Sequence, residues 1–79
     1  MKYVYILKNE RNPPRRYIGL TGDLRARLLR HNAGEVCSTA RHRPWHIDVY
    51  IAFSDNRRAL AFERYLKSGK GHAFARKRF

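Results

Sequence analysis

The stretch Trp45–Phe53, WHIDVYIAF, alternates apolar and polar side chains along its whole length. This period of two is typical of a β-strand with one buried face, and it is the clearest strand pattern in the chain. We therefore predict a sheet that contains this strand. The side chains predicted to share its buried face are Trp45, Ile47, Val49, Ile51 and Phe53.

Two further strands are expected upstream. Residues 2–8 (KYVYILK) are rich in β-forming residues, and the polar segment 9–15 with its two prolines turns the chain toward residues 16–20 (RYIGL). In the first of these strands both faces are apolar, so we expect it to be covered on both sides. Tyr3, Tyr5 and Leu7 share one face, and Val4 and Ile6 share the other.

Helices are predicted between and after these strands. Thr21 and Asp23 offer capping chemistry for a helix that ends near residue 32, and Asp55 with Asn56 for a second helix that stops at residues 68–69. The first helix carries Leu24, Leu28 and Leu29 as its apolar residues, and the second carries Ala59, Leu60, Phe62 and Leu66. Residues 33–44 show little periodicity and are predicted to form an exposed, basic loop.

These elements give the order ββαβα, with residues 71–79 as a short C-terminal helix. The fold class is α/β, more specifically α+β, with a small three-stranded sheet flanked by helices. We expect one domain over residues 1–79, because a chain of 79 residues has room for only a modest core.

The net charge of the chain indicates what kind of partner it binds. Lys and Arg number 18 against 6 Asp and Glu, a formal net charge of +12 that is spread along the chain. Such an excess of positive charge favours binding to a polyanion. DNA is a polyanion of this kind, and each basic side chain that contacts a phosphate releases counterions and so strengthens binding. No apolar run of membrane-spanning length and no signal peptide is seen, so we expect a cytoplasmic protein that binds neither membranes nor a small-molecule substrate. The single Cys37 offers neither an internal disulfide nor a zinc site.

Glu63 is the most unusual residue of the chain. At about 100° per residue it falls near the centre of the apolar arc of the helix over residues 56–68. A half-buried carboxylate needs a partner, so Glu63 is either a metal ligand or the anchor of a salt bridge.

A second group of polar side chains is expected to converge on the sheet. Arg27 and His31 are i, i+4 neighbours beside the apolar stripe of the first helix, and Tyr5 and Tyr17 come from the first two strands. Phosphodiester hydrolysis needs a cation for the charge on phosphate, a base for water, and a metal-bound carboxylate. These four residues and Glu63 supply such a set.

At these positions the sequence resembles the GIY-YIG nucleases. Val4-Tyr5 stands at the first triplet, Tyr17-Ile18-Gly19 reproduces the second, residues 23–28 (DLRARL) look like the start of the family's helix, and His31 matches a frequent histidine. Residues 61–69 (AFERYLKSG), which contain Glu63, look like the small stand-alone branch of the family. Two differences matter for the chemistry. Leu20 follows the second triplet where many members have lysine, and no asparagine follows Glu63, although several members have one in the C-terminal segment.

The resemblance implies a DNA nuclease that depends on Mg²⁺ or Mn²⁺. Glu63 would be the metal ligand, Arg27 would hold the scissile phosphate, and Tyr5 or Tyr17, with Tyr5 favoured, would act as or position the general base. His31 would assist by hydrogen bonding. With no lysine at position 20, another cation would have to lower the pKa of a catalytic tyrosine.

Two functions therefore remain open: a nuclease that recognises DNA structure rather than sequence, acting in repair or recombination, and a non-catalytic nucleic-acid-binding module with the same fold. Both predict salt-sensitive binding to DNA, preferably single-stranded, nicked or branched, and only the nuclease requires Glu63 and a metal. The residues expected to contact phosphates are Arg41, Arg43, Lys67, Lys70, Arg76, Lys77 and Arg78.

Overall fold

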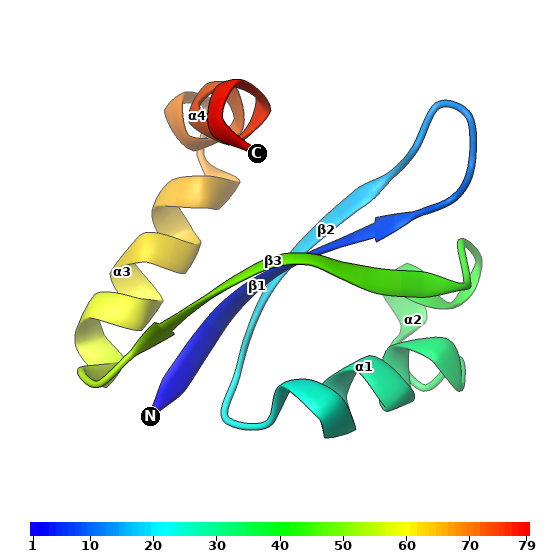
Figure 1. The fold of residues 1–79 in the computed structure, drawn as a ribbon, viewed down its shortest axis with the longest axis horizontal. Helices are drawn as coiled ribbons and strands as arrows, with labels where there is room; N and C mark the ends of the chain where they lie inside the picture. Colours follow the sequence, from blue (N-terminus) through cyan, green and yellow to red (C-terminus); the bar gives the residue numbers. More distant parts are fainter.

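The computed structural model describes every residue from Met1 to Phe79 and contains a three-stranded antiparallel sheet with helices on both sides (Figure 1). The strand order is β2-β1-β3, so the strand predicted to be covered on both faces is the central one. The predicted α+β class is confirmed, and the predicted elements occur in the expected order, with one additional short helix. The elements are β1 (Lys2–Asn9), β2 (Arg16–Thr21), α1 (Leu24–Asn32), α2 (Cys37–Ala40), β3 (Trp45–Phe53), α3 (Asn56–Lys67) and α4 (Gly69–Arg78).

The central strand β1 separates two small cores. Tyr5 and Leu7 point toward α1 and pack with Trp45, whereas Val4 and Ile6 point toward α3 and α4. All four β1 side chains are at most 2% exposed, and burying a side chain of this size stabilises a fold by roughly 1.5–3 kcal/mol. The two-faced pattern predicted for this strand is confirmed.

In β3, the five apolar residues do not share one face, and that prediction is wrong. The β1 residues opposite Val49 and Ile47 are consecutive, which leaves Asp48 as an extra residue of a β-bulge. Beyond the bulge the side chains change sides: Val49 packs with the α3 core, whereas Ile47 and Trp45 pack with Tyr5. A bulge adds one residue without interrupting the apolar alternation, so the sequence pattern does not reveal it.

The helix caps follow the sequence predictions. The Asp23 side chain accepts a hydrogen bond from the backbone N–H of Ala26 (3.1 Å), and Asp55 caps α3 in the same way. Leu29 and Leu60 were expected to be buried but are 66% and 38% exposed. Each lies about 100–140° around its helix from the buried face, so it points mainly to solvent.

Residues 33–44 are not simply an exposed loop, because they contain the short helix α2 and the fully buried Thr39. Asn32 attaches this segment to the sheet through two side-chain hydrogen bonds to the backbone of Trp45, at 2.6 and 3.0 Å. The indole Nε1 of Trp45 donates in turn to the carbonyl oxygen of Thr39 at 2.9 Å. Through these bonds Trp45, at the start of β3, holds the backbone of Thr39 in place.

The predicted C-terminal helix is confirmed as α4, which packs against α3. Ala75 is buried in the α3 core, and a Cβ on Gly71 would overlap the backbone of Tyr65. The C-terminal segment is therefore a packed helix with a basic outer surface. None of the helices has the length and apolar character needed to cross a membrane.

Candidate active site

Tyr5 is the centre of a hydrogen-bonded cluster on the α1 side of the sheet. Its phenol oxygen lies 2.9 Å from Nε2 of His31 and 3.4 Å from Nε of Arg27, which donates to it. Strand β1 supplies Tyr5, and one face of α1 supplies both Arg27 and His31. The predicted i, i+4 pair thus converges on the phenol.

His31 is fully buried, and its second ring nitrogen is also bonded. Nδ1 lies 2.7 Å from the hydroxyl oxygen of Thr39, and this hydroxyl donates to the carbonyl oxygen of Val36 at 3.3 Å. Neither contact was predicted from the sequence, since a lone threonine in an irregular segment carries no recognisable signal. Thr39 is therefore a site residue that only the structure reveals.

One placement of the protons gives every hydrogen in this cluster a protein acceptor. The Tyr5 hydroxyl donates to Nε2 of His31, and Nδ1–H of His31 donates to Thr39. With the opposite tautomer, Tyr5 would receive two donors, and its own buried hydrogen would have no acceptor. The bonds thus leave Nε2 of His31 as the atom that can take the phenol proton.

Burial sets the protonation states of this pair. It raises the pKa of Tyr5 above 10.0, although the hydrogen bond and positive charge of Arg27 act in the opposite direction. Burial also lowers the pKa of His31 below 6.5, and the charges of Arg27 and Arg30 lower it further. Both residues are therefore neutral at pH 7, with the proton on the phenol and a free acceptor beside it.

Tyr17 lies next to this cluster, and its phenol contributes to the raised pKa of Arg27. Its ring centroid is 5.0 Å from that of His31 and 6.4 Å from that of Tyr5, and its side chain is half-buried. Tyr17 therefore forms part of the wall of the site and remains accessible from solvent.

Glu63 is the predicted site residue with the least direct connection to the Tyr5 cluster. Its carboxylate forms an ion pair with Lys67 one turn later on α3, at 2.7 Å, and its side chain is 13% exposed. It makes no bond to Arg27 or to either tyrosine. Lys67 nonetheless links α3 to the site. It lines a cavity together with Tyr17, and its positive charge lowers the pKa of Tyr5, although this is the smallest of the effects on that pKa.

The comparison with protein families agrees with this geometry. Residues 1–77 match the model of the GIY-YIG catalytic domain, which is nearly the whole chain. The chain belongs to the GIY-YIG family. No curated protein and no solved structure matches the chain. Membership gives the protein a nuclease-type fold, in a family that generally depends on divalent metals.

Packing against Tyr5 explains the glycine of the second GIY-YIG triplet in this chain. Gly19 pairs with Tyr5 across β1 and β2, and a Cβ at this position would overlap the phenol ring of Tyr5. The lysine that many GIY-YIG members have after this triplet is Leu20 here, which packs into the α3 core. Arg27 and, more weakly, Lys67 are the cations that lower the pKa of Tyr5 in its place.

The residues predicted to contact phosphates lie in two areas. Arg41 and Arg43 follow α2, and Lys67 with the α4 residues lies on the other side of the sheet. Two of these residues also make structural bonds: Lys67 pairs with Glu63, and Arg43 donates from Nε to the carbonyl oxygen of Ala40 at 2.9 Å. All seven side chains are exposed, namely Arg41, Arg43, Lys67, Lys70, Arg76, Lys77 and Arg78.

Proposed function

We propose that this GIY-YIG protein is a DNA nuclease that hydrolyses phosphodiester bonds with the aid of Mg²⁺ or Mn²⁺. The observation that carries the proposal is the Tyr5 phenol held between Arg27 and a neutral His31, at 3.4 and 2.9 Å. A structural tyrosine needs one partner for its hydroxyl. This phenol has a proton acceptor and a fixed cation, which are two of the components needed for attack on a phosphate.

Tyr5 acts as the general base in this proposal. Its oxygen takes a proton from the attacking water while its own proton passes to Nε2 of His31, which becomes an imidazolium. The raised pKa of Tyr5 makes the phenolate a strong base once the proton has left. Thr39 accepts from Nδ1 of His31 throughout and keeps Nε2 directed at Tyr5.

Arg27 stabilises the charge that develops on the phosphate. Its guanidinium lies partly exposed beside the phenol, and its hydrogen bond to Tyr5 raises its pKa further above the ordinary value for arginine, so it stays charged. A planar guanidinium can bind two phosphate oxygens at once, which an ammonium cannot do in a fixed geometry.

Glu63 is the residue that would hold the metal. No group of three or more acidic, histidine or cysteine side chains gathers in the structure. A single carboxylate suits Mg²⁺, which commonly binds one or two protein carboxylates and fills its other positions with water and substrate phosphate. The metal supplies neutralisation of charge on the phosphate and the leaving oxygen. Glu63, which pairs with Lys67 in this structure, would have to release this partner to hold the cation.

The substrate is proposed to be DNA recognised by its structure, as in repair or recombination, within the cytoplasm. A net charge of +12 and exposed basic side chains on both sides of the sheet favour contacts to the phosphate backbone. Such contacts fix position along DNA but carry little sequence information.

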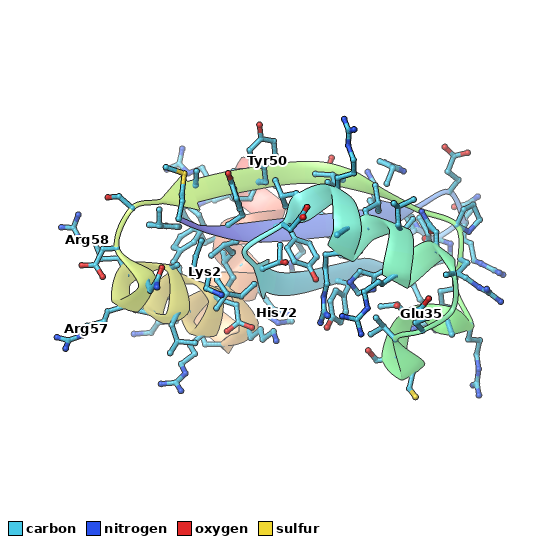
Figure 2. All side chains as sticks on the ribbon, turned by 90° about the horizontal axis from the view of Figure 1, so that it is seen from below. Lys2, Glu35, Tyr50, Arg57, Arg58 and His72 are labelled. Carbon is cyan, nitrogen blue, oxygen red and sulfur yellow. The ribbon has the colours of Figure 1, made fainter.

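The test is cleavage of labelled single-stranded, duplex, nicked and branched DNA, with and without Mg²⁺ or Mn²⁺. We expect cleavage that requires the metal, and its loss in Glu63→Gln, because an amide does not carry the charge that holds the ion. Glu35→Gln makes the same chemical change at an exposed residue that Figure 2 places away from α3 and should cleave normally. Cleavage in excess chelator, or normal turnover by Glu63→Gln, would contradict the metal role. Binding of DNA without any cleavage by the wild type would identify a non-catalytic module.

A further inference from the structure

A cavity of about 630 Å³ opens between β2 and α4, next to the candidate active site. Its size lies in the range of sites that hold small organic ligands. Strand β2 contributes Arg16 and Tyr17, α3 contributes Lys67, and α4 contributes His72 and Arg76. The cavity is therefore built by residues that come together only when α4 folds back toward the edge of the sheet.

The cavity lining carries several basic side chains and no acidic ones. Lys67 is neutralised by Glu63, but neither Arg16 nor Arg76 pairs with an aspartate or glutamate side chain. The only side-chain hydrogen bond of Arg16 goes to the backbone carbonyl of Phe79, at 3.2 Å. Two unpaired guanidinium groups at one opening create a positive potential that a bound phosphate would relieve.

The remaining wall of the cavity is apolar. Tyr17, Ile18 and Ala75 line it together with Pro14. Tyr17 is the same residue whose ring packs on His31 at 5.0 Å, so one side of this ring belongs to the active-site cluster. An aromatic wall beside cations is the combination that binds single-stranded nucleic acid, in which bases stack on rings and phosphates meet basic groups.

We infer that this cavity binds an unpaired nucleotide adjacent to the phosphate that is cut, with its phosphate at Arg16 and Arg76 and its base against Tyr17. A paired nucleotide does not enter a concave cavity, because its partner base would have to enter as well. This inference rests on the proposed nuclease function and specifies its substrate as DNA with an unpaired strand beside the scissile bond.

The experiment measures binding in chelator, where no cleavage occurs. A short fluorescent single strand and a blunt duplex of the same length are titrated with wild type and with Arg16→Ala/Arg76→Ala at one fixed salt concentration. The control variant is Arg57→Ala/Arg58→Ala, which removes the same charge from exposed residues at the start of α3, where Figure 2 shows them directed away from the body. Circular dichroism checks that each variant is folded.

We expect the cavity variant to lose roughly tenfold or more in affinity for the single strand and much less for the duplex. Its slope of log affinity against log salt should fall by about 1.4 on the single strand, since each lost phosphate contact removes about 0.7. The control should weaken both ligands similarly. Equal losses on the two ligands by the cavity variant, or a selective loss by the control, would overturn the inference.

A competition arm tests for the base. A deoxynucleoside monophosphate should displace the single strand at a lower concentration than inorganic phosphate, and Tyr17→Ala should remove this difference. Equal competition by the two compounds would overturn the proposal that a base stacks on Tyr17.

Selective binding of the single strand by a wild type that never cleaves DNA would leave the cavity assignment intact and reject the nuclease function. Cleavage that is unaffected in Arg16→Ala/Arg76→Ala on every substrate would reject the cavity and retain the nuclease.

Discussion

The phenol ring of Tyr5 lies against the backbone of Gly19 on the neighbouring strand, in space that any side chain at residue 19 would occupy. The ring is fully buried by this contact, and its hydroxyl is directed toward Arg27 and His31. The glycine therefore positions the proposed general base, although it has no reactive group itself.

Gly19→Ala should reduce cleavage by at least roughly tenfold, because the added methyl group displaces the phenol from His31. Overpacking of this kind also destabilises a fold by roughly 1–3 kcal/mol. Gly69→Ala is the matched control, since a Cβ there meets no atom within 4 Å. Turnover and urea denaturation measure the two effects. Normal turnover by a folded Gly19→Ala protein would show that the phenol position is not critical.

Arg27→Ala should lower turnover by roughly 100-fold and weaken DNA binding only modestly, because many other cations contribute to affinity. Arg27→Lys should restore little activity, since an ammonium lacks the planar pair of donors. Arg25→Ala, an exposed residue of the same helix, serves as the control. Single-turnover cleavage and anisotropy separate the two effects. Intact turnover with a large rise in the dissociation constant would make Arg27 an ordinary phosphate contact.

The pH dependence of stability should report the burial of His31. Its pKa is lowered in the folded state, so between about 6.5 and that lower value the unfolded chain binds more protons. The free energy of unfolding should therefore be highest above pH 6.5 and fall as the pH decreases through this range. The pKa of His42 is also lowered, so the share of His31 is the part of the slope that His31→Gln removes. An identical slope in this variant would exclude the contribution of His31.

The sequence was sufficient to predict the three strands and the longer helices, and to predict that Arg27 and His31 point toward Tyr5. Arg27 and His31 stand one helical turn apart beside buried leucines, so helical periodicity alone directs both toward the sheet. The bulge at Asp48 and the burial of Thr39 lacked such a signal, because the bulge depends on pairing with the distant strand β1 and Thr39 is held by hydrogen bonds to the side chains of His31 and Trp45. The apolar arc around Glu63 did not reveal its ion-pair partner either, which is Lys67, one turn later on α3.

Thr39→Val should lower turnover by roughly tenfold or more, because it leaves Nδ1–H of buried His31 without its acceptor and frees the ring to change tautomer. Thr39→Ser keeps the hydroxyl and should retain most of the activity. The nitrogen chemical shifts of His31 report the tautomer directly, and we expect the hydrogen on Nδ1 in the wild type. A hydrogen on Nε2 in the wild type, or full activity in Thr39→Val, would reject this positioning role.

Lys67→Met should lower the metal concentration needed for half-maximal cleavage. The ammonium of Lys67 lies 2.7 Å from the carboxylate that would bind the ion, and this bond raises the pKa of Lys67, so the lysine stays charged and competes with the metal. Lys67→Met also leaves the largely buried Glu63 carboxylate, which is 13% exposed, without its partner, so we expect the metal-free protein to lose more stability than the loss of a surface ion pair would cause. Maximal turnover can fall in the same variant, because Lys67 also lines the basic cavity, so the informative measurement is the midpoint of the metal titration.

Lys70→Met removes an equal charge from an exposed residue without an acidic partner and should leave the midpoint unchanged. An unchanged or higher midpoint in Lys67→Met would show that the metal does not replace Lys67 at Glu63.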